Sequence, residues 1–383
     1  MSNRLRLFVL AGEASGDRIG ADLVQRLWKR TEVEVDGVGG ADLAAEGLHS
    51  MFPMSDLSVM GWSDVLLRLP LLLWRARQVA NAIIRSAPDV VVLIDSQVFT
   101  RVVAERVRKS GARVPMLLYV APAVWVWAPE RAAKLKPLFD EVLAVLPFEP
   151  KVMAELGGPP TSYVGHPALS RQPMRVASPE RGPMLLLPGS RVGELKRHMG
   201  LMRTAVEALR DHPRVSGFVL PTLGHLRERL VAEVAGWAAP AKVVTGAERN
   251  AAVAAEVGAF AVSGTVTLEL AMAGVPMVVT YVGDRGQAKR FAQLATPPMV
   301  GLPNIVAGRE VVPELLFPDD VEPGRVGPTL RRLLDDRAAI AAQLAAFRDI
   351  RTLMQKGAPE APLVDPAERV LAVAAQSRLL IGS

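Results

Sequence analysis

Short apolar runs alternate with segments of helical periodicity along most of the chain. In the first half, the runs that read as buried strands are Leu5–Leu10, Val33–Val38, Val90–Ile94, Met116–Val120 and Glu141–Leu146. In the second half, they are Met184–Leu187, Ser216–Leu220, Lys242–Val244, Ala259–Val262 and Met277–Tyr281. This alternation is typical of strand-helix-strand units that build a parallel sheet. The pattern therefore predicts an α/β protein.

The alternation is interrupted between Thr161 and Pro183, where prolines, serines and arginines show little periodicity. This segment is the best candidate for a linker. Because 383 residues is long for a single hydrophobic core, we expect two domains of ordinary size. Two doubly wound halves would place a ligand cleft between the carboxyl ends of their sheets.

The most membrane-like stretch is "VLLRLPLLLWRARQVANAII", Val65–Ile84. Arginines and a proline interrupt it well short of the roughly 20 apolar residues that a transmembrane span needs. It reads as an amphipathic helix pair or a kinked helix, with arginines placed to meet anionic headgroups. A buried helix with snorkelling arginines fits the same pattern. The apolar side would consist of Leu66, Leu67, Leu69, Leu71, Leu72, Leu73 and Trp74.

The amino-acid composition excludes several classes of function and site. The chain has no cysteine, which excludes disulfides, zinc-thiolate sites and cysteine nucleophiles. Its net charge of +6 is spread along the chain, so a nucleic-acid interface is not expected, while anionic lipid or nucleotide phosphate remains open. The five histidines show no metal-binding spacing. No secretion signal precedes the first predicted strand, so we expect a cytoplasmic protein.

The first predicted strand runs into a glycine-rich turn, "LAGEASGD". Glycines at every fourth position match neither the dinucleotide-binding motif nor a phosphate-binding loop. Glu13 and Asp17 would repel a pyrophosphate, whereas ionised carboxylates accept hydrogen bonds from sugar hydroxyls. The turn therefore predicts a sugar-binding loop. A plain turn with Asp17 near a helix start is the alternative.

Two loops of the second half suit an anion. In "LLLPGSRVGELKRH", a Pro-Gly-Ser turn brings backbone amides, a helix N-terminus and the Arg191 guanidinium together. In "AFAVSGTVTLEL", Ser263, Gly264 and Thr265 open a helix, and Glu269 follows where it can grip a diol such as ribose. One such loop could be an ordinary helix cap, but two in one domain favour a nucleoside diphosphate.

Two further segments carry candidate chemistry. Asp95 closes a buried strand and faces the predicted cleft, where it suits a general base, although capping the next helix is an equal alternative. In "YVAPAVWVWAPERAAKLK", Trp125 and Trp127 stand beside Arg131. They form either an aromatic rim over an amphiphilic ligand or part of the core, and alternation does not decide between the two.

Together these segments resemble the lipid-A-disaccharide synthase family. The matching motifs follow in order along almost the whole chain: "LAGEASGD", "VMGWSDVL", "YVAPAVWVWAPER", "LPFEP", "YVGHP", "LLLPGSRVGELKRH", "SGTVTLELAMAGVPMVVTY" and "GLPNIVAGREVVPELL". The resemblance implies a GT-B fold, in which two Rossmann-like, doubly wound parallel-sheet domains face each other and the C-terminal helix returns to the first domain. The implied boundaries are 1–170 for the acceptor and membrane-facing domain, 171–345 for the UDP-sugar domain and 346–383 for the returning helices.

The resemblance also implies an activity. The chain would be an inverting hexosyltransferase that moves diacylglucosamine from UDP-diacylglucosamine to diacylglucosamine 1-phosphate. It would need no metal or other cofactor. It would work as a peripheral protein on the inner face of the cytoplasmic membrane, and a homodimer is also expected.

The resemblance assigns roles to particular residues. Asp95 would be the base, and the acceptor would contact Gly12, Glu13, Ser15, Gly16 and Asp17. Lipid or membrane would meet Leu66, Leu69, Leu72, Leu73, Trp74, Trp125, Trp127 and Arg131. UDP would be bound by Gly189, Ser190, Arg191, Glu194, Ser263, Gly264, Thr265, Glu269, Asn304, Arg309 and Glu310.

Two departures from the family pattern lie on the acceptor side. After Asp95 the family usually continues Ala-Pro-Asp-Phe-Asn, whereas this chain has Ser96, Gln97, Val98, Phe99 and Thr100. A second carboxylate is lost, and the second Trp is followed by Ala128 and Pro129 rather than a polar residue. The alternatives are a related GT-B transferase with a different lipid acceptor, a UDP-sugar epimerase, or a non-catalytic relative.

Overall fold

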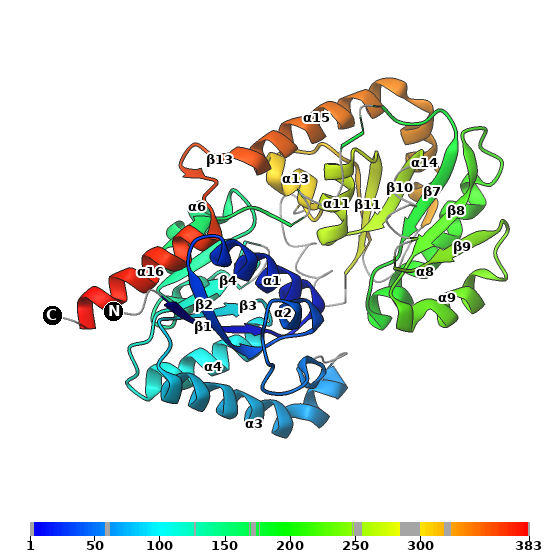
Figure 1. Cartoon of the computed structure of the whole chain (residues 1–383). Coiled ribbons are helices and arrows are strands. Elements are labelled where there is room, and N and C mark those ends of the chain that lie inside the picture. Colours follow the sequence, from blue (N-terminus) through cyan, green and yellow to red (C-terminus); the bar gives the residue numbers. More distant parts are fainter. Residues whose placement is uncertain are drawn as a thin grey trace. The chain divides into compact units, whose positions relative to one another are not determined.

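The chain forms two compact units in a computed structural model (Figure 1). The first unit comprises Met1–Pro167 and Met354–Ser383, and the second comprises Ala168–Leu353. The structure describes residues 4–57, 62–125, 128–167, 169, 174–175, 177–246, 248, 255–283, 299–317 and 323–381, with the backbone alone for 62–67 and 378–381.

The first unit is built on a six-stranded parallel sheet. The sheet order is β2-β1-β3-β4-β5-β6. The strands are β1 (Arg4–Ala11), β2 (Glu32–Val38), β3 (Val90–Ile94), β4 (Met116–Tyr119), β5 (Glu141–Ala144) and β6 (Thr161–Tyr163). The helices between them are α1 (Ala14–Trp28), α2 (Ala41–Ala45), α3 (Trp62–Ser86), α4 (Gln97–Lys109), α5 (Glu130–Leu135) and α6 (Glu149–Glu155).

Helices cover both faces of this sheet. Side chains of a strand alternate between its faces, so Phe8 and Leu10 point into a core shared with buried residues of α3 and α4. Figure 1 shows α3 and α4 on one face and α1 with α16 (Pro366–Ile381) on the other. Because both faces are covered, the central strand β3 is apolar and fully buried along its whole length.

The C-terminal segment belongs to the first unit. It consists of the end of α15 (Arg337–Lys356), the short strands β13 (Gly357–Ala358) and β14 (Ala361–Pro362), and α16. Arg369 of α16 makes two 2.8 Å contacts with the carboxylate of Glu141, which is buried in β5. Asp365 pairs with Arg26 of α1 and with Arg30, which follows that helix. The returning helix is therefore fixed by ion pairs as well as by apolar packing.

The second unit repeats the design. Its parallel sheet has the order β12-β11-β10-β7-β8-β9. The strands are β7 (Gly182–Leu187), β8 (Val215–Pro221), β9 (Ala241–Val244), β10 (Gly258–Val262), β11 (Met277–Val282) and β12 (Glu314–Phe317). The helices are α8 (Val192–Leu209), α9 (Arg227–Val234), α11 (Thr265–Ala273), α13 (Leu302–Ala307), α14 (Val326–Asp335) and α15.

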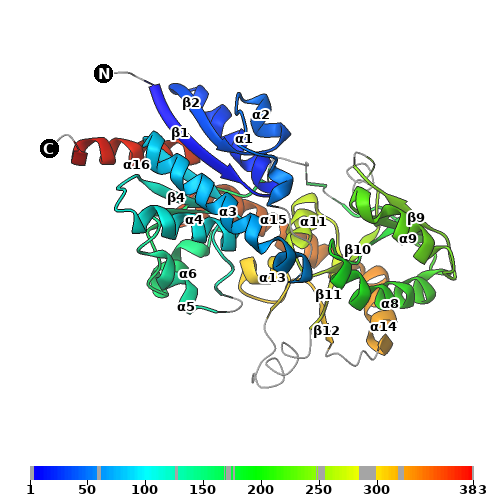
Figure 2. The same cartoon turned by 90° about the horizontal axis from the view of Figure 1, so that it is seen from below.

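The core of the second unit lies between its sheet and two helices. Buried residues of α8 and α14 pack together with Phe260 and Val278 of the sheet (Figure 2). Gln343 of α15 exchanges hydrogen bonds with the backbone of Met277, so this helix is tied to the start of β11.

The prediction of an α/β fold with two parallel sheets is confirmed, and all ten predicted strands are present. Four strands were not predicted: β6 and β12 of the two parallel sheets, and the two-residue strands β13 and β14. β6 lies inside the segment that was read as a linker. β6 and β12 are short edge strands next to prolines, and such strands carry little periodicity.

Candidate functional site

In the first unit, two predicted segments meet at one edge of the sheet. The chain leaves β1 toward β2 on one side and later returns to β3 on the other side, so the order of strands reverses between β1 and β3. The register pairs Ala11 with Ile94, which makes the turn at Gly12 and the residue Asp95 neighbours. Open parallel sheets bind ligands at such a switch point, beyond the carboxyl ends of the strands.

Glycine at position 12 is required by this close approach. A Cβ atom on Gly12 would lie 2.1 Å from Oγ of Ser96, the residue after Asp95. A Cβ on Gly16 would lie 3.4 Å from Cγ2 of Ile94, so α1 also packs closely on β3. The absence of side chains therefore brings the glycine turn against the segment that carries Asp95.

Asp17 has a different place from the one expected. Its carboxylate is buried and accepts hydrogen bonds from three backbone amides at the start of α2: Gly40 at 2.7 Å, Asp42 at 2.9 Å and Leu43 at 3.3 Å. Asp17 therefore caps α2, a helix that begins more than twenty residues later in the chain. Glu13 and Ser15 are the exposed polar side chains of the turn.

The backbone around Asp95 is strained. Asp95 has φ +50° and Ser96 has φ +43°, and Val120, which follows the neighbouring strand β4, has φ +76°. Residues other than glycine rarely adopt positive φ, and a β-branched valine is a clear outlier there. The amide of Asp95 donates to Tyr119 O at 3.0 Å, so the two strained segments are held together. Such strain is concentrated at functional sites in proteins.

The segment predicted to meet lipid forms a single helix, α3, which continues through Pro70. Leu69 and Leu73 are each 42% exposed and Trp74 is 56% exposed, whereas one face of the C-terminal half of the helix is buried in the core. Arg75 binds Asp56 through Nε at 2.9 Å and lies over the ring of Phe52. The exposed residues Leu69, Leu73 and Trp74 are called the α3 apolar patch below.

The remaining lipid-side residues are only partly described. Leu72 is half-buried against the core, and the side chain of Leu66 and all of Trp127 lie outside the described residues. Trp125 is half-buried and meets the ring of Phe148 edge-on, with centroids 5.0 Å apart. Its ring is thus part of the packing of the first unit.

In the second unit, the switch point lies between β10 and β7. The register pairs Ala261 with Leu187, so the turn after β7, with Gly189, Ser190 and Arg191, lies beside the turn after β10. The guanidinium of Arg191 is exposed at the start of α8. The two turns predicted to bind an anion are therefore neighbours on one edge.

Glu194 occupies the amides of the first turn. Its Oε2 accepts hydrogen bonds from Ser190 N at 2.8 Å and Arg191 N at 3.1 Å, and its Oε1 lies 3.3 Å from Nη1 of Arg191. Glu194 therefore caps the start of α8 by accepting from the backbone amide of the N-cap residue Arg191. A carboxylate already lies on donors that were predicted to hold phosphate.

The turn after β10 is held from within the unit. Ser263 donates its hydroxyl to Val300 O at 2.6 Å, and Gly264 has φ +154°. Thr265 is exposed at the start of α11, and Glu269 is half-buried one turn later. Ser263 therefore fixes the turn, while Thr265 and Glu269 lie on one face of α11, four residues apart.

The side-chain amide of Asn304 makes all of its hydrogen bonds inside the second unit. Its Nδ2 donates to Val312 O and to Glu314 Oε1, and its Oδ1 accepts from the amides of Val311 and Val312. These four hydrogen bonds are all that an amide side chain can make. Asn304 therefore holds the turn after α13, in which Arg309 and Glu310 are exposed.

Two residues were missed by reasoning from sequence. Glu314 accepts from the amides of Val300 and Gly301 and so fixes the segment that Ser263 also binds, and burial raises the pKa of its carboxyl. His198 is buried, and its Nε2 accepts from Val282 N at 3.0 Å. Its Nδ1 therefore carries the proton and donates to Glu194 O at 2.7 Å, while burial lowers the pKa of the ring. A neutral His198 thus links the first turn of α8 to the end of β11.

Within the described part of the chain, no group of three or more His, Cys, Asp or Glu side chains is arranged to hold a metal ion. Nor does any helix described there combine the length and apolarity that crossing a membrane would require.

Comparison with known proteins gives consistent results. A family model described as lipid-A-disaccharide synthetase matches residues 7–360. A lipid-A-disaccharide synthase of Nitrobacter hamburgensis is 40% identical over 363 residues, which cover 92% of this chain and 91% of the relative. The fold is similar to that of a putative UDP-N-acetylglucosamine 2-epimerase from Listeria monocytogenes (TM-score 0.58, 14% identity, 99% of this chain and 97% of the other). It is also similar to the glycotransferase of kitacinnamycin (TM-score 0.57, 14% identity, 98% and 99% covered).

Proposed function

Because the chain belongs to the lipid-A-disaccharide synthetase family, we propose that it carries out the family's reaction with residues at its two switch points. The chain is a GT-B glycosyltransferase of lipid A synthesis. It takes a UDP-sugar and a lipid acceptor. The finer assignment is that diacylglucosamine moves from UDP-diacylglucosamine to diacylglucosamine 1-phosphate, giving the disaccharide 1-phosphate and UDP.

Asp95 is the base of this reaction. It accepts the proton of the acceptor hydroxyl, whose oxygen forms a bond to the anomeric carbon as the bond from that carbon to UDP breaks. Attack from the face opposite UDP inverts the configuration. The position of Asp95 supports the role, because it stands in strained backbone at a switch point, against the glycine turn of the acceptor side. Glu13 and Ser15 are the exposed groups of that turn that can orient the sugar.

The second unit stabilises the departing UDP. The exposed guanidinium of Arg191 and the N-termini of α8 and α11 supply positive charge where negative charge develops. Glu269 accepts hydrogen bonds from the ribose hydroxyls, and Arg309 with Glu310 borders the same site. These groups do electrostatically what a metal ion does in other transferases, so no metal or cofactor is needed.

The protein works at a membrane surface. The α3 apolar patch and the neighbouring exposed Arg68 and Arg77 combine apolar side chains with positive charge, which is the composition of an interfacial helix. This placement lets acyl chains be handled without leaving the bilayer. The cytoplasmic, inner-membrane location and the homodimer remain predictions.

The observation that carries this proposal is the meeting of the glycine turn and Asp95 at the switch point of the first unit. We expect Asp95→Asn to lower kcat by about 10²- to 10⁴-fold, because the general base is lost while the side-chain shape is kept. The assay uses UDP-diacylglucosamine and the monophosphate acceptor in EDTA, with mass detection of the disaccharide. Binding of UDP to the variant is expected to be unchanged. Full activity of the variant would remove Asp95 as the base, and loss of wild-type activity in EDTA would contradict metal independence.

A further inference from the structure

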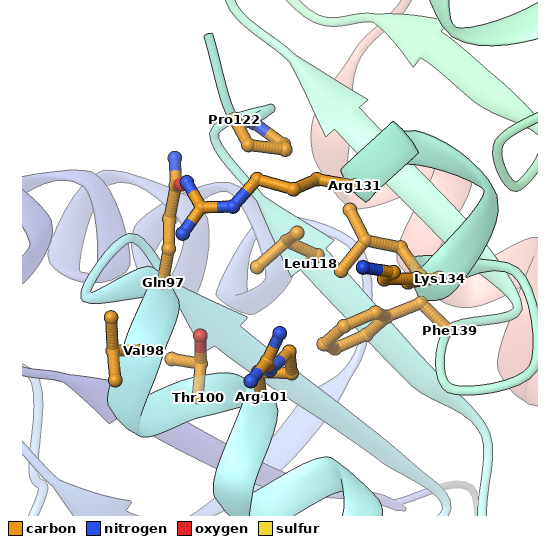
Figure 3. A pocket seen from close by; sticks show the side chains of 10 residues that line it. Gln97, Val98, Thr100, Arg101, Leu118, Pro122, Arg131, Lys134 and Phe139 are labelled. Carbon is orange, nitrogen blue, oxygen red and sulfur yellow. The ribbon is translucent and has the colours of Figure 1, made fainter. Parts of the chain in front are cut away.

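A pocket of the first unit lies between α4, β4 and α5 (Figure 3). Its floor is apolar and is formed by Leu118, Pro122, Leu135 and Phe139. Gln97, Val98 and Thr100 of α4 form one wall. All three belong to the segment where the chain departs from the family pattern.

Three cationic side chains surround this apolar floor: Arg101 on α4, and Arg131 and Lys134 on α5. Figure 3 shows the guanidinium of Arg131 reaching across the pocket toward Gln97, with Arg101 rising from α4 below it. Arg131 and Lys134 are three residues apart and therefore share one face of α5. Floor and rim together combine an apolar surface with clustered positive charge.

The first of these cations has a carboxylate nearby on its own helix. The Nε of Arg101 lies 3.4 Å from a carboxylate oxygen of Glu105, one turn along α4, without forming a hydrogen bond, and 43% of the Arg101 side chain is exposed. Arg101 can therefore also reach a ligand on the pocket side.

Two further features add to the positive potential. The pocket lies at the N-terminus of α4, a thirteen-residue helix whose N-cap, Ser96, makes no side-chain capping bond. This end of a helix favours anions. At the position where the family pattern has a carboxylate, the chain has Val98, which is 71% exposed. The acid that would neutralise the rim is therefore replaced by an apolar side chain.

We propose that this pocket binds the phosphate of the acceptor lipid, with the first part of an acyl chain over the apolar floor. The inference rests on the proposed function, and it names Arg101, Arg131 and Lys134 as the residues that select a phosphorylated acceptor. Asp95 and Gln97 are at most about 7 Å apart along the chain, the size of one sugar ring. The reacting hydroxyl and the phosphate of one sugar can thus reach the base and the pocket together.

The test compares two acceptors that differ only in the phosphate. We expect Arg131→Gln and Lys134→Gln each to raise KM for diacylglucosamine 1-phosphate about tenfold, with kcat and the KM for UDP-diacylglucosamine unchanged. The KM for the dephosphorylated acceptor is expected not to move. Lys136→Gln, an exposed lysine of the same segment outside the pocket, is the matched control.

Two further measurements identify the source of the anion. Inorganic phosphate is expected to compete with the phosphorylated acceptor in the wild-type protein and to lose this effect in Arg131→Gln. Binding to anionic vesicles is expected to be the same in all variants. Equal effects on both acceptors, no effect on either, or weaker vesicle binding by the pocket variants would each overturn the proposal. Failure of the proposed function gives a different result, because the wild-type protein would then convert neither acceptor.

Discussion

Carboxylates near the two switch points have separate roles that the residue type alone does not reveal. Asp17 is buried on three backbone amides and fixes the start of α2, whereas Asp95 stands in strained backbone at the end of β3. Glu194 covers two amides of the turn that was predicted to hold phosphate. The surroundings of each carboxylate, more than its place in a motif, decide what it can bind.

Glu194 offers a residue-scale prediction. A diphosphate bound beside Ser190 N and Arg191 N would be repelled by this carboxylate, so we expect Glu194→Gln to bind UDP about three- to tenfold more tightly. The amide still offers one acceptor oxygen to the turn, although the weaker cap should lower the stability of the second unit by about 1 kcal/mol. Titration calorimetry with UDP measures the first effect and urea unfolding the second. Glu207→Gln, which changes an exposed glutamate on the same helix, is the control.

Weaker binding of UDP by Glu194→Gln than by the wild-type protein would contradict this prediction. It would show that the Glu194 carboxylate organises the turn for the ligand.

Sequence reasoning at this scale found the segments but not all contacts. It placed Gly12, Asp95, Arg191 and Glu269 on the loops at the carboxyl ends of strands, because strand and turn signals are local. It could not show that residues 40–43 return to Asp17, or that Asn304 is saturated by its own turn. Such contacts depend on tertiary folding, which no spacing in the sequence records.

Among the elements, α3 combines two of the readings that its pattern allowed. One face of its C-terminal half is buried in the core, whereas Leu69, Leu73 and Trp74 are exposed nearer its start. The arginines of this segment do not distinguish a membrane-facing helix from a buried one. Arg75 is bound to Asp56 within the unit, so only some of these arginines lie on the surface. The helix therefore joins the core of the first unit to the α3 apolar patch.

The α3 apolar patch leads to an element-scale prediction. We expect Leu73→Ser combined with Trp74→Ser to weaken binding to anionic vesicles about tenfold or more, since each half-exposed side chain contributes about 1 kcal/mol when a bilayer covers it. Co-sedimentation with vesicles measures the effect. Val231→Ser removes a similarly exposed apolar residue from α9 and should change nothing. Equal binding by the double variant and the wild-type protein would exclude the patch as the membrane contact.

Strands with a clear apolar run were predictable, and the edge strands β6 and β12 were not. The ten predicted strands are apolar runs bounded by turn signals, which is the pattern of strands buried on both faces. The strands β6 and β12 contain three and four residues and lie at the sheet edges, next to prolines. Their place is determined by the strands beside them, so their own residues give little signal.

At the scale of the whole molecule, the two units share one architecture, but their candidate sites differ in chemistry. Each places a turn-rich edge at the point where strand order reverses. The first carries acids and a cationic pocket, and the second carries an arginine and helix N-termini. This division of labour supports the transfer of a sugar from a nucleotide to a phosphorylated alcohol.

Buried acids give the molecule a pH-dependent stability. Burial raises the pKa of Glu256 to about 7 and that of Glu149 to about 8. Because these folded-state values lie above the unfolded ones, the stabilising contribution is present at pH 4–5 and is lost as the pH rises toward 8. For Glu256, whose carboxylate oxygens lack a hydrogen-bond partner among the described residues, the loss is about 3 kcal/mol.

We expect Glu256→Gln to reduce this loss. The amide cannot ionise, so the free energy of unfolding of the variant should fall less between pH 5 and pH 8 than that of the wild-type protein. Urea unfolding at the two pH values measures the difference, and Glu233→Gln, an exposed glutamate of the second unit, serves as the control. Parallel pH profiles for the wild-type protein and Glu256→Gln would contradict the assignment.

The left-handed backbone at Asp95, Ser96 and Val120 has a consequence for how such a chain can evolve. Each of these conformations costs the fold of the order of 1–3 kcal/mol. Glycine or asparagine would adopt these conformations at a lower cost. In descendants that no longer need catalysis, we therefore expect substitutions to glycine or asparagine at these positions, which would raise thermal stability while activity is lost. Selection for heat resistance alone would therefore tend to remove the catalytic activity.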